Sequence, residues 1–156
     1  MTIRAACDDV GQMEVGRELQ SAHEIDGLLA RTRSVAVVGV SSDPSRPSRE
    51  IAEYLLARSD WTVYLVNPNL ESVLGRDVYP TLGALPDPPD IVDVFRRHEH
   101  LAAVTDQAIA AGAKALWFQL DLVDDAAAGR AVAAGLDVVQ DHCLGVEHRR
   151  WARART

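Results

Sequence analysis

The chain has 156 residues, of which 47% are hydrophobic, and a formal net charge of −7. This length predicts one domain with a sizeable core, because two domains of ordinary size need a longer chain. The negative charge argues against broad binding to nucleic acid or to anionic membranes, since both depend on dense positive surface.

The sequence lacks long apolar segments and closely spaced pairs of metal ligands. No stretch approaches 18 uninterrupted apolar residues, and the N-terminus has no apolar core of signal-peptide length, so we expect a cytoplasmic protein without membrane contact. Cys7 and Cys143 lie far apart and outside any CxxC pair, which predicts neither a disulfide framework nor a zinc site. A late run of metal-ligand residue types lacks the tight ligand pairs of metal centres, and no metal is predicted. This run consists of Asp141, His142, Cys143, Glu147 and His148.

The predicted elements alternate along the chain. Residues 1–33 combine a polar lead with a weakly periodic segment that is expected to form one or two helices at the domain edge, with the first ten residues frayed. Strands are then predicted from Ser34 to a break at Gly39 and at residues 61–66, 77–79, 91–95, 114–119 and 137–140. Helices are predicted to begin near Pro47, Leu101 and Asp124. The domain is expected to span residues 34–150, and the basic end from Arg149, including a tail at 151–156, is expected to be solvated or frayed.

This alternation predicts an α/β fold, a Rossmann-like, doubly wound, mostly parallel sheet with helices on both faces. The expected strand order is 3-2-1-4-5-6. In such a sheet a ligand binds beyond the carboxyl ends of the strands, where the strand order reverses. The candidate segments are therefore residues 39–48, 67–68, 95–97 and 119 onward.

The most informative segment runs from Ser34 to Ser48 and reads SVAVVGVSSDPSRPS. Its β-branched residues do not alternate with polar ones, which is typical of a strand buried on both faces. Gly39 allows a tight turn, and Pro47 suits the first turn of a helix. The free N–H groups and positive dipole end of such a helix start attract an anion, so this turn is a candidate phosphate site.

Two common nucleotide-binding patterns are missing. A dinucleotide site would show GxGxxG in this turn and an acidic residue at the end of the second strand. The turn has a single glycine, and the second strand ends in Asn67 and Pro68. The absence of GxxxxGK[ST] also argues against a P-loop nucleoside triphosphatase.

Six stretches in order resemble one known family. They are VAVVGVSSDPSRPSREIAEYL, VYLVNPN, GRDVYPTL, DIVDVFRR, GAKALWFQL and AAGLDVVQDHCLGVEHRR, over roughly residues 34 to 150. Together they resemble the small stand-alone CoA-binding proteins of bacteria, relatives of the CoA-binding domain in the alpha subunit of succinyl-CoA synthetase. The resemblance implies these contacts: Gly39, Val40 and Ser41 at the pyrophosphate turn, Arg46, Pro47 and Ser48 at the phosphates, Asn67 and Pro68 at the adenosine end, and Phe95 and Arg96 flanking the ligand.

The residue chemistry agrees with a phosphate-rich ligand such as CoA. An acidic protein must gather donors locally to hold phosphates, and arginine forms bidentate pairs with them. Such arginines are Arg46, Arg49, Arg96 and Arg97. Gln119 either binds the ligand or satisfies loop backbone, and Cys143 either lies near the CoA thiol or is a packing residue.

These observations predict a small-molecule partner, CoA or an acyl-CoA, held by a binding or regulatory module. The runner-up is an enzyme that uses CoA or a nicotinamide nucleotide. No catalytic residue is predicted, because the sequence shows no recognisable order of Ser, His and Asp and no nucleophile motif. Whether the chain forms homo-oligomers is left open.

Overall fold

A seven-stranded sheet in the order β3-β4-β2-β1-β5-β6-β7 forms the centre of the protein. The computed structural model describes residues 15–155. All neighbouring strands are parallel except β3 and β4, which are antiparallel. The strands are β1 (Ser34–Val38), β2 (Thr62–Val66), β3 (Ser72–Val73), β4 (Arg76–Tyr79), β5 (Ile91–Val94), β6 (Ala115–Phe118) and β7 (Asp137–Val139).

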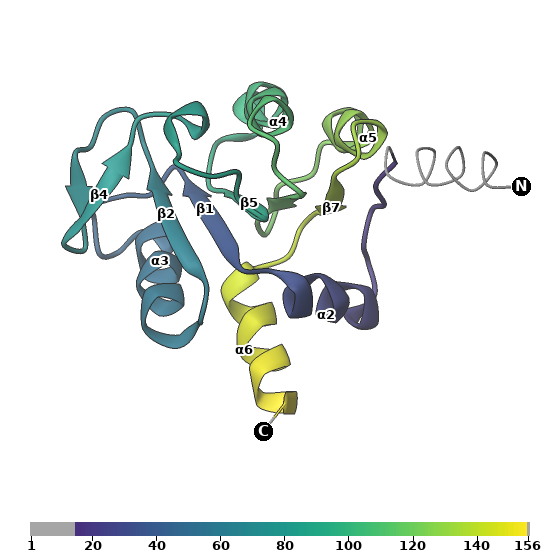
Figure 1. Cartoon of the computed structure of the whole chain (residues 1–156), viewed down its shortest axis with the longest axis horizontal. Coiled ribbons are helices and arrows are strands. Elements are labelled where there is room, and N and C mark those ends of the chain that lie inside the picture. The colour runs from purple at the N-terminus through teal and green to yellow at the C-terminus, as the bar shows by residue number, and fades with distance from the viewer. Residues whose placement is uncertain (1–14, 156) are drawn as a thin grey trace, which may run out of the picture.

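Helices cover both faces of this sheet, as Figure 1 shows. One face carries α2 (Ala22–Arg31), α3 (Pro47–Arg58) and α6 (Leu144–Arg155). The other face carries α4 (Leu101–Ala110) and α5 (Asp125–Ala133). Short 3₁₀ turns lie at Leu82–Ala84 and His98–His100. No helix among residues 15–155 has the length and apolar character needed to cross a membrane.

The predicted Rossmann-like fold is confirmed. The six predicted strands correspond to β1, β2, β4, β5, β6 and β7, and they lie in the predicted spatial order. The strand order differs from the prediction by one added element, the two-residue strand β3, which pairs with β4 at the edge of the sheet. Two residues are too few to show a periodic pattern, so this strand could not be predicted from the sequence.

The absence of alternation in β1 has a direct structural reason. Val35 and Val37 pack beneath α2, α3 and α6, whereas Ala36 and Val38 pack beneath α4 and α5. All four are at most 6% exposed. A strand covered on both sides needs apolar residues at every position. The sheet is therefore a rigid platform, and the loops that follow its parallel strands lie at its carboxyl edge.

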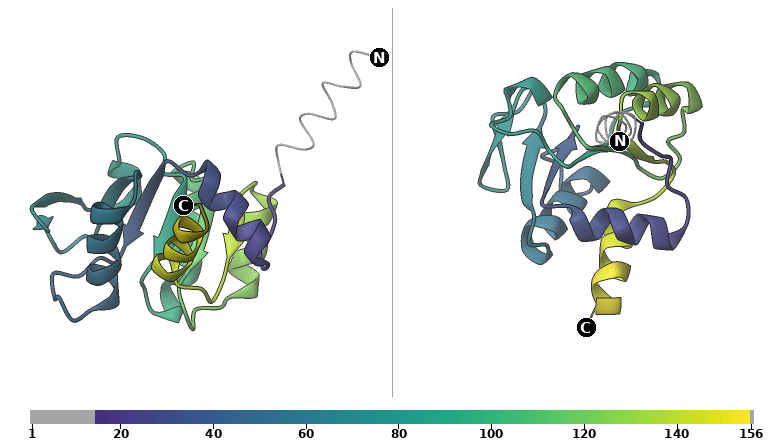
Figure 2. Two further views of the ribbon diagram at one scale, coloured as in Figure 1. Left: turned by 90° about the horizontal axis from the view of Figure 1, so that it is seen from below. Right: turned by 45° about the vertical axis from the view of Figure 1, so that its right-hand side comes forward.

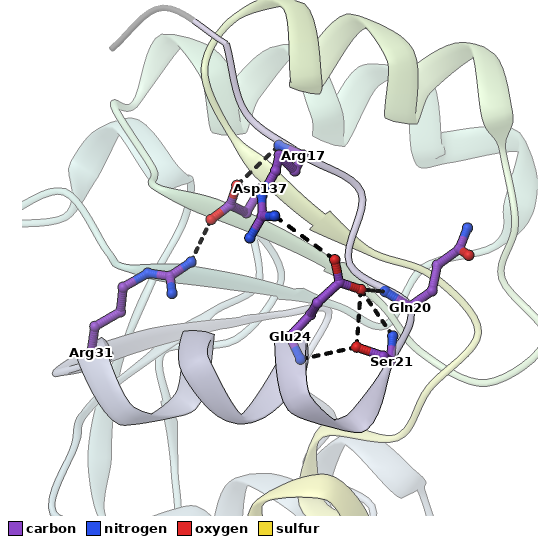
Figure 3. Close-up of polar contacts among 6 residues, drawn as sticks. All are labelled: Arg17, Gln20, Ser21, Glu24, Arg31 and Asp137. Atoms are coloured by element: carbon purple, nitrogen blue, oxygen red, sulfur yellow. Dashed lines mark hydrogen bonds and ion pairs between the residues drawn. The ribbon is translucent and has the colours of Figure 1, made fainter. Parts of the chain in front are cut away.

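The segment before β1 is hydrogen-bonded to β7, the edge strand at the end of the sheet away from β3. Its chain runs beside β7, where Leu19 donates its N–H to the carbonyl of Val138, and it then enters α2. A capping box starts this helix, because Ser21 accepts from the Glu24 N–H while the Glu24 carboxylate accepts from the Ser21 N–H, each at 3.1 Å (Figure 3). Arg31 pairs with Asp137 at the other end of α2. The described part holds one helix here, and the predicted fraying falls on residues outside the described range.

The basic end of the chain corrects a prediction. Residues 149–155 continue helix α6 and are not frayed, although Arg149 and residues 153–155 are exposed to solvent. In Figure 2 this helix lies between α3 and α2, and it contacts both. Leu144 is fully buried in the core, and Trp151 packs against the same cluster. The spacing of Leu144, His148 and Trp151 places them on one helical face, which the charged residues between them obscured.

Candidate ligand site

The chain turns sharply at Gly39, directly after β1. Gly39 has φ of +91°, and a Cβ added there would lie 2.2 Å from the carbonyl oxygen of Phe95. Two backbone segments therefore meet at a distance that only glycine permits. The turn is also tied to β2, because the Gly39 N–H donates to the Val66 carbonyl at 2.9 Å.

The loop from Ser41 to Ser48 is held by its own side chains. Ser48 is 4% exposed, and its hydroxyl accepts from the Ser41 N–H at 3.0 Å. The Ser41 hydroxyl accepts from the N–H of Asp43, whose carboxylate accepts from the N–H and hydroxyl of Ser45. These bonds from Ser45 lower the pKa of Asp43. The loop is thus shaped before any ligand arrives.

Helix α3 begins at this loop and opens onto it. Arg46 is the N-cap residue, and its side chain makes no capping hydrogen bond. Pro47 occupies the first turn, as the sequence predicted. The helix start therefore combines uncapped backbone donors, a positive dipole end and one guanidinium group, all of which attract an anion.

Asn67 clamps the turn from the neighbouring strand. Its side-chain amide donates to the Val40 carbonyl at 2.8 Å, and its side-chain oxygen accepts from the Asn69 N–H, also at 2.8 Å. In the sequence, Asn67 is notable because it stands at the end of the second strand, where a dinucleotide site has an acidic residue. The structure adds that this residue must donate as well as accept, which an aspartate cannot do at neutral pH.

These elements surround a cavity of about 800 Å³ at the carboxyl edge of the sheet. This volume is within the range of small-molecule sites. All but one of the predicted contact residues line it: Gly39, Val40, Ser41, Arg46, Pro47, Ser48, Asn67, Phe95, Arg96, Gln119 and Cys143. The exception, Pro68, lines an adjoining cavity of about 260 Å³ that shares Gly39 and Arg96 with the first.

The four candidate arginines separate in the structure. Arg46, Arg96 and Arg97 line the large cavity, whereas Arg49 does not and instead pairs with Glu53 at 3.3 Å. Arg46 is the N-cap residue and has an extended backbone, whereas Arg49 lies within α3 and pairs with Glu53 one turn further along the helix. The cavity therefore carries three guanidinium groups.

Gln119 and Cys143 both line the cavity. Gln119 is 8% exposed, and its side-chain oxygen accepts from the Leu144 N–H at 3.1 Å. This residue therefore satisfies the loop backbone and lines the cavity at the same time. Cys143 is a half-buried free thiol beside it, while Cys7 lies outside the described residues. Among residues 15–155, no three His, Cys, Asp or Glu side chains are grouped as metal ligands.

Sequence reasoning missed several lining residues. They are Glu50, Ile51, Asn69 and Leu70, whereas Ser42, Leu120, Asp121 and Leu122 also line the cavity and lie within the candidate segments. Ile51 fitted the core pattern of α3, and only the structure shows that it also reaches the cavity. Leu120 was detectable only by its place after a strand end, yet it is 59% exposed, unusual for a large apolar side chain.

Comparison with known proteins decides the family. Residues 33–149 match the CoA binding domain family over most of the chain. The chain belongs to this family. The relationship predicted from six sequence stretches is therefore confirmed, and CoA binding in general is the property that unites the family.

Relatives of this CoA-binding domain occur as small proteins and as parts of larger ones. An uncharacterized protein of Bacillus subtilis (strain 168), YneT, is 33% identical over 128 residues, 82% of this chain and 94% of its own length. A hypothetical protein from Pyrococcus horikoshii OT3 is 36% identical, with a TM-score of 0.81 over 90% of this chain and 99% of its own. A dinucleotide forming acetyl-coenzyme A synthetase 1 of Ca. Korarchaeum cryptofilum is 26% identical, with a TM-score of 0.61 over 67% of this chain and 25% of its own.

The Asn67 clamp of this CoA-binding domain leads to a prediction. We expect Asn67→Asp to lower the free energy of unfolding by about 1–3 kcal/mol, because the Val40 carbonyl loses its donor and faces a carboxylate. Urea unfolding at pH 7 measures this change. Asn69→Asp is the matched control, since only the backbone of Asn69 takes part in the clamp. Equal effects of the two substitutions would contradict the role assigned to the Asn67 amide.

Proposed function

We propose that the protein binds CoA or an acyl-CoA in the cavity at the carboxyl edge of the sheet, as a non-catalytic binding or regulatory module. One observation carries this proposal. The contacts implied by the family resemblance come from three separate loops, and all but Pro68 line one cavity.

The shape of the cavity suggests how CoA lies in it. The pyrophosphate sits at the turn from Gly39 to Ser48, where the start of α3 and Arg46 supply donors and positive charge. The adenosine end lies toward Asn67, and the pantetheine arm runs past Phe95 toward Cys143. The apolar residues Leu120 and Leu122 border that far end, which suits an acyl group on the thiol.

The proposal predicts a ligand preference. CoA should bind more tightly than NAD or ATP, because Asn67 and Pro68 stand where a dinucleotide site has a ribose-binding acid. Calorimetric titration of the three ligands measures this preference directly. NAD binding as tight as that of CoA would remove the support for the CoA assignment and favour an enzyme that uses a nicotinamide nucleotide.

The two neighbouring arginines of α3 provide a matched pair of variants. Arg46→Ala should weaken CoA binding by about 1.5–3 kcal/mol, the range for hydrogen bonds to charged groups. Arg49→Ala should leave the affinity nearly unchanged, because Arg49 pairs with Glu53 away from the cavity. Circular dichroism checks that both variants stay folded. Equal losses of affinity would show that total charge, and no particular contact, governs binding.

A further inference from the structure

A second cavity, of about 480 Å³, lies between α3 and α6. It is lined by Tyr54, Arg58, Arg149, Ala152 and Arg153. Its α3 residues belong to the last turns of that helix, whereas the CoA cavity borders the first turn. At 1.5 Å per residue, the centres of the two sets of α3 residues lie roughly 10 Å apart along the helix, and the two cavities share no lining residue. This second cavity is therefore separate from the proposed CoA site.

A cluster of aromatic rings fixes one wall of this cavity. The Tyr54 hydroxyl and Nδ1 of His148 are hydrogen-bonded at 2.8 Å, and His148 is only 3% exposed. The rings of Trp61 and Trp151 meet His148 edge to face, with centroids 4.9 and 5.7 Å away. Such contacts hold each ring in one orientation. Tyr54 is thus a rigid support at the base of the cavity.

Arginine side chains are stacked on this cluster. The guanidinium carbon of Arg149 lies 4.7 Å from the centre of the Tyr54 ring, and that of Arg155 lies 4.4 Å from the centre of the Trp151 ring. Stacking orients a guanidinium group and does not consume its N–H donors. Within residues 15–155, Arg58 and Arg149 form no ion pair with any carboxylate. Arg58 and Arg149 therefore present donors to the cavity that have no ion-pair partner among the described residues.

The local charge balance is positive in an otherwise acidic protein. Arg58, Arg149 and Arg155 gather here, and burial lowers the pKa of His148. The opposing features are Asp60, which acts on His148, and the carboxyl ends of α3 and α6. Each helix end is equivalent to about half a negative charge. These features offset about two of the three positive charges of Arg58, Arg149 and Arg155, so a positive excess remains for a bound anion.

We infer that the cavity between α3 and α6 is a second ligand site, which binds a compact oxyanion with at least two negative charges, such as a phosphate-bearing or polycarboxylate molecule. Arg58 and Arg149 approach it from two helices, and a guanidinium group can bind such groups through two parallel hydrogen bonds. The site does not depend on CoA as the ligand of the first cavity.

Inorganic pyrophosphate is a suitable probe. Titration into the full chain saturated with CoA, at low ionic strength, should show one saturable site. Arg58→Gln and Arg149→Gln should each weaken this binding at least about tenfold, the effect of losing one charge-assisted hydrogen bond. Arg76→Gln, which removes the same charge on β4 at the edge of the sheet, should change the affinity less than twofold. Thermal unfolding confirms that the variants remain folded.

Competing anions define the chemistry of the site. Citrate should displace pyrophosphate because it carries several carboxylates, and acetate at the same concentration should not. The absence of saturable pyrophosphate binding would overturn the inference, as would equal weakening by Arg76→Gln. If CoA itself does not bind, the same titration without CoA still tests this site through the two arginine variants.

Discussion

Replacing Gly39 with alanine is expected to lower the free energy of unfolding by about 2–5 kcal/mol and to abolish tight CoA binding. Two costs combine in this estimate. A left-handed backbone costs a residue with a Cβ about 1–2 kcal/mol, and forcing atoms into a packed region adds about 1–3 kcal/mol. The added Cβ would lie 2.2 Å from the Phe95 carbonyl oxygen, so β1 and β5 would have to separate at the cavity. Urea unfolding and calorimetric titration of CoA measure the two effects.

Gly75 provides a control that separates the two costs. It has φ of +70°, but a Cβ added there would meet nothing within 4 Å. Gly75→Ala should therefore show the backbone cost alone and leave CoA binding unchanged. If the two alanine variants lose the same stability, the close approach of Gly39 to Phe95 does not shape the turn.

Asp93 is the subject of the second large prediction. It lies in β5 between Val37 and Trp117, is 0% exposed, and neither carboxylate oxygen has a hydrogen-bond partner among the described residues. An unpartnered buried polar group costs about 1–3 kcal/mol in measured protein variants. Asp93→Val, which places a strand-forming apolar residue there, should therefore raise the free energy of unfolding by about that amount at pH 8.

The stability gained by this substitution should depend on pH. Burial raises the pKa of Asp93 well above its usual value, so the folded protein binds this proton more tightly than the unfolded chain does. The stability that this proton adds to the folded protein is fully present below the pKa of Asp93 in the unfolded chain. It is lost as pH rises toward the pKa of Asp93 in the folded protein. The advantage of Asp93→Val should therefore grow with pH across this window and then stay constant.

Two further comparisons isolate Asp93. Asp93→Asn keeps a polar group but cannot ionise, so it should remove the pH dependence without the full gain of valine. The lowered pKa of His148 gives an opposite trend, with stability lost as pH falls, and this trend cancels when each variant is compared with the original chain. A stability difference between Asp93→Val and the original chain that does not change with pH would show that burial does not raise the pKa of Asp93 above its value in the unfolded chain.

Several features were predictable because they rest on local patterns. The run of β-branched residues before Gly39 indicated a strand covered on both faces, and Pro47 marked the start of α3. Helical spacing and right-handed crossovers then determined the strand order, and the strand order determined which loops meet at the carboxyl edge. The cavity and most of its lining residues followed from these steps.

Other features were decided only when segments distant in the sequence came together. Asn67 and Val40 are 27 residues apart, and nothing in either stretch shows that an amide of one holds the carbonyl of the other. The sequence predicted a tail at the basic end of the chain. In the structure Tyr54 and Trp61 contact the ring of His148 and so hold α6 against the domain.

Fold class, strand order and the position of the proposed CoA cavity were thus determined by the sequence alone, because periodicity, turn residues and chain direction are properties of neighbouring residues. The tertiary structure alone decided that Arg46 lines the cavity and Arg49 does not, that Asp93 is buried without a partner, and that arginines of α3 and α6 meet at a second cavity. Each of these depends on how layers of the fold pack, and packing joins residues whose separation along the chain carries no signal.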